Sequence, residues 1–129
     1  MIKTAINPWQ WQFDRNYVQA VEVKNVEGTL YCSGQTAIDA QGVSSTADMK
    51  TQLLLAIENV EQVIEKANYS CEGIVRLNIY TTSVSELMQH FPILQAWLVK
   101  HKIEQASTVL EVNKLFESLT VELEATVVK

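Results

Sequence analysis

The stretch YCSGQTAIDAQG, residues 31 to 42, is the part of this chain best suited to bind a polar ligand through its backbone. Ser33 and Gly34 end an apolar pattern that is typical of a strand. A glycine at that point lets a ligand approach backbone amides closely, and those amides could hold a carbonyl or carboxylate group. The same pattern also fits a plain strand that ends in a glycine turn, so the stretch alone does not identify a site.

The residue patterns that other common enzyme classes require are absent from this sequence. His90 and His101 are isolated, and Cys32 and Cys71 lie far apart in the sequence, so we expect no metal site. Ser33 lacks the preceding glycine that a nucleophile elbow requires. With only four glycines, the chain has neither a phosphate-binding loop nor a dinucleotide fingerprint. Triad hydrolases and nucleotide-dependent enzymes are therefore poor candidates.

Composition predicts one domain, residues 1–129, in a chain of 129 residues. Hydrophobic residues make up 47% and charged residues 19%, which favours an oligomer over a well-packed monomer. The net charge of −5 and the scattered basic residues argue against a nucleic acid or an acidic membrane surface as partner. No spanning run or secretory signal is visible, so we expect a cytoplasmic protein with free, buried cysteines.

Regular periodicity predicts five strands and two helices in the order β-β-α-β-α-β-β. The strands are expected at residues 17–23, 29–34, 74–82, 107–112 and 119–128, the first two paired as a hairpin. Ser45 and Asp48 have the spacing of a capping box, which predicts that a helix starts there. Its apolar face would hold Leu53, Leu54, Ile57, Val60, Ile64 and Ala67. Ser83 and Glu86 open the second helical stretch, which Pro92 should kink or restart.

The last strand alternates cleanly, so one face should join the core while Glu122 and Glu124 lie on the other. Two amphipathic helices can cover only one face of a sheet. We therefore expect an α+β fold, a mixed sheet with both helices on one face. The free face must be polar or covered by a neighbouring subunit.

The segments YVQAVEV, YCSGQTAIDAQG, IVRLNIYTT, STVLEV and LTVELEATVV, with the helix QLLLAIENVEQVIEKA, resemble the Rid family of small enamine/imine deaminases, also called YjgF or UK114. The resemblance covers about residues 17–128. It implies a chorismate-mutase-like subunit, a homotrimer around a central barrel, and ligand clefts at subunit boundaries. Members release ammonia from intermediates such as 2-aminoacrylate and need no cofactor. The resemblance places ligand contacts on Tyr17, Ser33 and Gly34, and the water-positioning carboxylate on Glu122.

The sequence differs from the archetypal family pattern at the arginine expected to bind the substrate carboxylate. Archetypal members carry an arginine in a PARSCVEV segment, and gapless alignment with QASTVLEV puts Ser107 at the arginine and Val109 at the cysteine. A guanidinium binds a carboxylate bidentately, and such a charge-assisted contact contributes about 1.5 to 3 kcal/mol. Its loss should weaken a 2-imino-acid substrate by at least roughly tenfold to a hundredfold. Inefficient turnover of 2-aminoacrylate is therefore expected.

Two hypotheses follow. The first is a hydrolytic deaminase of an enamine or imine that is neutral or differently anchored, with Glu122 handling water and Ser107 binding polar atoms. The second is a non-catalytic trimer that binds a small metabolite or serves a regulatory role. Ribonuclease activity, also attached to this family, is disfavoured by the acidic balance. Trp9 and Trp11 could form a hydrophobic clasp or a pocket rim, and Arg15 could supply a substitute cation.

Overall fold

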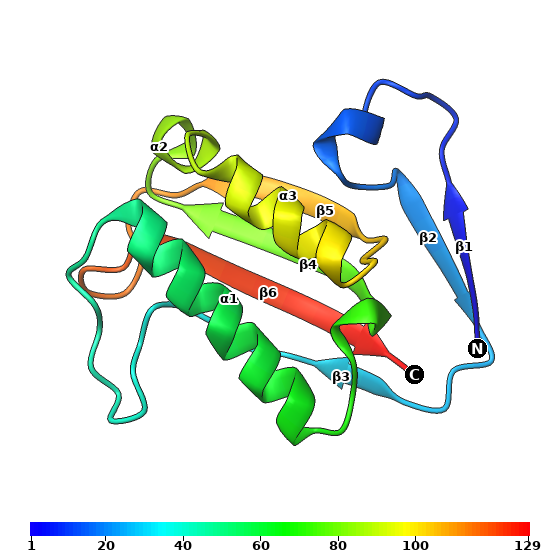
Figure 1. The fold of residues 1–129 in the computed structure, drawn as a ribbon, viewed down its shortest axis with the longest axis horizontal. Helices are drawn as coiled ribbons and strands as arrows, with labels where there is room; N and C mark the ends of the chain where they lie inside the picture. Colours follow the sequence, from blue (N-terminus) through cyan, green and yellow to red (C-terminus); the bar gives the residue numbers. More distant parts are fainter.

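The computed structural model describes residues 1–129 and confirms the α+β fold predicted from the sequence (Figure 1). A four-stranded mixed sheet has the order β3-β6-β4-β5. Its strands are β3 Thr29–Tyr31, β6 Val121–Val128, β4 Ile74–Thr81 and β5 Ala106–Glu111. Strand β6 runs antiparallel to β3 and β4, whereas β5 runs parallel to β4. The long connection between β4 and β5 holds helices, as a parallel pair requires.

The helices cover one face of this sheet. Helix α1, Met49–Lys66, packs across β6, and α3, Phe91–Lys100, lies over β4 and β5, with the short α2, Val84–Met88, before it (Figure 1). Twenty buried residues, most of them from these helices and the inner sheet face, form one hydrophobic core. The opposite face of the sheet has no helix over it.

Helix α1 begins later than the predicted capping box. Asp48 is the N-cap, and its carboxylate accepts a hydrogen bond from the Thr51 backbone N–H at 3.0 Å. The Ser45 hydroxyl instead accepts from the Ala47 N–H, in a turn before the helix. Assigning the start of the helix to Ser45 was therefore wrong, because the serine hydroxyl makes its hydrogen bond within the loop before the helix.

Pro92 restarts the second helical stretch. Ser83 caps α2 by accepting from the Glu86 N–H at 3.2 Å, as predicted. The chain then leaves the helix for two residues and re-enters it as α3 with Pro92 in the first turn. Proline fits there because first-turn N–H groups have no partner within the helix.

The N-terminal hairpin differs from the prediction. Strand β2, Ala20–Lys24, pairs antiparallel with β1, Ile2–Ile6, and not with β3 as expected. Strand β3 pairs with β6 instead. The hairpin joins the main sheet only through a bridge between Val18 and Ala106 at the β5 edge. The hydrophobic pattern located β2 but did not reveal its partner, because β1 is short and mostly exposed.

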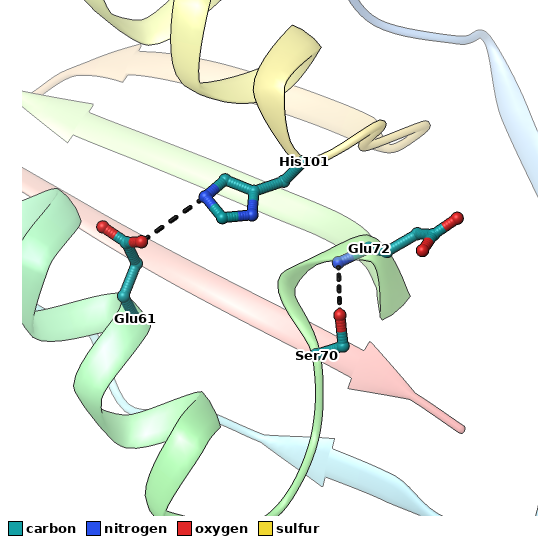
Figure 2. Close-up of polar contacts among 4 residues, drawn as sticks. All are labelled: Glu61, Ser70, Glu72 and His101. Carbon is teal, nitrogen blue, oxygen red and sulfur yellow. Dashed lines mark hydrogen bonds and ion pairs between the residues drawn. The ribbon is translucent and has the colours of Figure 1, made fainter.

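Figure 2 shows two polar contacts, one between the helices and one in the turn before β4. The His101 Nε2 atom, just after α3, lies 3.4 Å from a carboxylate oxygen of Glu61 on α1. The Ser70 hydroxyl accepts from the Glu72 N–H at 3.3 Å and caps the 3-10 turn, Cys71–Gly73, that leads into β4.

None of the helices is long and apolar enough to cross a membrane.

Two adjacent leucines of α1 test how this helix packs. Leu53 is completely buried, whereas Leu54, which the sequence placed on the same apolar face, is 46% exposed. Leu53→Ala should lower the free energy of unfolding by about 2 to 5 kcal/mol, because it leaves a cavity in the core. Leu54→Ala should cost less than about 1 kcal/mol. Urea unfolding of both variants measures the difference, and equal losses would contradict this orientation of α1.

Candidate functional site

The register of the sheet assigns the candidate residues to two faces. In the β4–β6 pair, Tyr80 lies opposite Glu122 and Ile79 opposite Leu123; in the β4–β5 pair, Leu77 lies opposite Ser107. Leu123, Ile79 and Leu77 belong to the core beneath the helices. Since successive side chains of a strand point to opposite faces, Ser107 lies on the helix side and Glu122 on the open side.

Glu122 is held beside the turn that follows β3. A Cβ atom added to Gly34 would lie only 2.6 Å from Cδ of Glu122, so only a glycine leaves room for the carboxyl group in this position. The turn is fixed to β6 by paired hydrogen bonds between the backbones of Gln35 and Leu123, at 2.7 and 2.9 Å. The structure therefore brings Gly34 and Glu122 together, with exposed Ser33 next to them in the chain.

Burial and a neighbouring charge raise the pKa of Glu122. Partial loss of solvent is the larger cause, and repulsion from Glu124 adds to it. Glu124 itself accepts hydrogen bonds from the Tyr80 hydroxyl at 3.0 Å and from the Asn78 amide at 2.9 Å. No side-chain hydrogen bond to Glu122 is present, so its carboxyl group is available to a ligand or a water molecule.

The second group of candidates lines a pocket on the helix side. This pocket has a volume of about 500 Å³ and contains Arg15, Tyr17, Ser107 and Val109. Its floor is apolar and comes from β4, α2 and α3. The floor residues are Leu77, Ile79, Met88, Phe91, Leu94 and Leu98. A largely apolar cavity with a few polar groups is the usual form of a small-molecule site.

Ser107 is already engaged in the sheet. Its hydroxyl donates to the backbone carbonyl of Leu77 at 2.8 Å. The oxygen can still accept a hydrogen bond from a ligand, but the hydroxyl proton is used. Position 107 therefore offers the pocket neither a positive charge nor a free donor.

Arg15 is the only cation in the pocket lining. Its guanidinium lies 5.3 Å from the centroid of the Trp11 ring, a cation–π distance. Trp11 in turn meets Tyr17 edge to face, with centroids 6.4 Å apart, and stacks on Trp9 at 6.3 Å. The aromatic segment thus lies at the rim of the pocket, and Trp9 and Trp11 remain more than half exposed.

The two groups do not meet within one chain. Gly34 and Glu122 belong to the open face, whereas Arg15, Tyr17, Ser107 and Val109 line the pocket under α3. The resemblance implied ligand clefts at subunit boundaries, and this division within one chain is compatible with that expectation. The parity of the strands contained the signal, because Ser107 and Glu122 have opposite orientations once the β4 register is known.

Two glutamines in the pocket lining were missed. Gln95 of α3 donates through Nε2 to the Asp14 carbonyl at 3.0 Å and to Asn16 Oδ1 at 2.8 Å. Gln105, which is buried, donates to the Asn16 carbonyl at 3.1 Å. These bonds fasten the Arg15 turn to the rest of the pocket. No signal in the sequence pointed to them, because the burial of Gln105 and the backbone partners of both glutamines appear only in the fold.

The sheet order and the one-sided helical layer define a mixed α+β protein, and comparisons with known proteins place it more narrowly. Residues 12–129 match the sequence family described as Endoribonuclease L-PSP. Because this match spans nearly the whole chain, the protein belongs to that family, which includes the Rid proteins. The resemblance noted in the sequence is thereby confirmed.

Relatives and solved structures agree with this assignment. The RutC family protein of Aquifex aeolicus is 29% identical, over 88% of each chain. The Rid-family protein YyfB of Yersinia pestis, described as of unknown function, is 25% identical, with a TM-score of 0.87 over the full length of both chains. Escherichia coli TdcF, solved with bound serine, shares the fold at 23% identity and a TM-score of 0.72, covering 97% of this chain and 91% of its own.

The raised pKa of Glu122 predicts a pH-dependent stability. Above the usual glutamate pKa of about 4.3 the unfolded chain loses this proton first, while the folded chain still holds it. The folded state then binds more protons, so stability falls as pH rises through this window. Urea unfolding of the wild type and of Glu122→Gln should show the wild type losing stability relative to the variant from about pH 4.3 upward. A constant difference across this range would contradict the raised pKa.

Proposed function

We propose that the protein is a hydrolytic deaminase of small enamines or imines. In this reaction water adds to the C=N carbon of the imine, the C–N bond then breaks, and ammonia leaves behind a carbonyl product. Membership of the Rid family supports the reaction class, as does the relative TdcF, which is named as a reactive intermediate deaminase. The proposed location is cytoplasmic.

The Glu122 carboxyl group is the observation that carries this proposal. It is partly desolvated, close to the Gly34 backbone, and free of side-chain hydrogen bonds, and its pKa is raised. A carboxyl group with a raised pKa can exchange a proton with water nearer to neutral pH than an ordinary glutamate. Glu122 would orient the attacking water and accept its proton, then return a proton to the departing nitrogen.

The pocket under α3 would hold the rest of the substrate. Tyr17 and the Ser107 oxygen line it as polar groups, and Val109 adds to its apolar wall. With serine at position 107, β5 supplies no charge to grip a carboxylate. This supports the expectation that 2-aminoacrylate is a poor substrate.

A complete site on this proposal forms between copies of the chain. Glu122 and the pocket lie on opposite faces of one sheet, so a neighbouring subunit must bring its Glu122 to the pocket. The open face carries exposed apolar side chains, among them Tyr31 at 80% and Leu110 at 49% exposure, which a neighbour would cover. We propose a homotrimer whose open sheet faces surround a central barrel, with each site at the boundary where the sheet edges of two subunits meet.

Turnover of freshly generated 2-imino acids tests the function. An L-amino acid oxidase acting on leucine, methionine or phenylalanine supplies the imines, and ammonia release is measured with and without the protein. Glu122→Gln should lower the accelerated rate by about a hundredfold or more, because general acid–base catalysis contributes that much.

Glu124→Gln is the matched control for this experiment. Glu124 lies on the same strand and face, but Tyr80 and Asn78 already occupy its carboxylate. This variant should stay within a few-fold of the wild type, because loss of solvent and not Glu124 is the larger cause of the raised pKa of Glu122. Equal rates for the wild type and Glu122→Gln would contradict the assignment of the reaction to Glu122.

A non-catalytic binding or regulatory trimer is the second candidate. The hydrogen bond from the Ser107 hydroxyl to the Leu77 carbonyl favours this candidate, because the hydroxyl proton holds the sheet together and is not free to act on a substrate. In the same assay this candidate gives no ammonia above background with the wild type. Small ligands would still raise the melting temperature, because binding to the folded state stabilises it.

A further inference from the structure

Arg15 has no partner in the structure other than an aromatic ring. Lys24–Glu22 is the one pair between a lysine or arginine and a carboxylate, so the guanidinium is paired with no carboxylate, Asp14 included. It also makes no hydrogen bond, whereas the other arginine, Arg76, donates to the Thr108 hydroxyl at 2.9 Å. The cavity that it lines has an apolar floor, and its other polar lining residues are Asp14, Tyr17, Gln95, Gln105 and Ser107. Asp14 is the one carboxylate among them, and it does not pair with Arg15. An unpaired guanidinium in this place is equipped to bind an anion bidentately.

The turn that carries Arg15 is fixed to the pocket by several hydrogen bonds. Asn16 follows it in the left-handed region at φ 60°, and the glutamines at positions 95 and 105 bind the backbone on either side of Arg15. The Val18 N–H also donates to the Gln105 carbonyl at 3.1 Å. Because Gln95 and Gln105 line the same cavity, the backbone that carries Arg15 is attached to the cavity wall. The Arg15 side chain itself is exposed and rests over the Trp11 ring.

The remaining lining restricts the ligand. The floor formed by β4, α2 and α3 is apolar, and Ser107 offers only an acceptor. An anionic group would therefore lie at the Arg15 rim, and an apolar chain would extend over Leu77, Phe91 and Leu94. A cavity of about 500 Å³ has room for an aliphatic or aromatic side chain.

We propose that Arg15 is the anion anchor of this pocket and that the preferred ligands are 2-imino or 2-oxo acids with an apolar side chain. The carboxylate is held from the N-terminal segment and not from β5. The inference rests on the proposed function only in taking this pocket as the binding site. It requires no turnover, so binding measurements test it separately from catalysis.

Isothermal titration calorimetry with 4-methyl-2-oxopentanoate and its uncharged amide is the test. The wild type should bind the carboxylate more tightly than the amide by about tenfold at low salt, allowing for the exposure of Arg15. Arg15→Ala should lose that preference, and Arg15→Lys should keep part of it. Arg76→Ala is the matched control and should bind as the wild type does, because Arg76 lies away from the pocket.

A second variant places the charge elsewhere in the same cavity. Ser107→Arg in the Arg15→Ala background should restore preference for the carboxylate, which also shows that the single variant was folded. The proposal is overturned if Arg15→Ala binds the carboxylate as tightly as the wild type does, or if the wild type binds neither probe. Ammonia release that depends on Glu122 could persist in either case, so the two proposals fail separately.

Discussion

The alternation of side chains across one β-sheet determines how this protein can work. Strand β4 pairs with β6 on one side and β5 on the other, and its register places Glu122 and Ser107 on opposite faces. No rotation of a side chain can bring a group through the sheet. A carboxyl group on the open face and an apolar pocket under α3 can thus cooperate only when a second copy of the chain lies against the first.

The proposed ligand pocket takes its positive charge from the N-terminal segment and not from β5. Strand β5 offers Ser107, whose hydroxyl completes a hydrogen bond within the sheet. The unpaired guanidinium of Arg15 comes instead from a turn that glutamines at positions 95 and 105 fasten to the pocket wall. On our proposal, the N-terminal segment that carries Arg15 takes part in ligand recognition.

Much of the fold could be read from the sequence, because the core strands alternate and Ser83 and Pro92 set the helix boundaries in their usual ways. The exposed strand β1 was missed, since five residues with little burial give no periodic signal. Ser45 and Leu54 were misassigned, because a capping pattern and an apolar residue each fit two local environments. The candidate residues were identified by resemblance, but their division between two faces depends on strand pairing, which one sequence does not specify.

The most direct measurement is a crystal structure of the protein with bound 4-methyl-2-oxopentanoate. The account predicts a ligand whose carboxylate meets Arg15 of one copy and whose 2-oxo carbon faces Glu122 of another, with the open sheet faces buried between copies. A ligand enclosed within a single chain, or an assembly that leaves Glu122 facing bulk water away from every pocket, would contradict it.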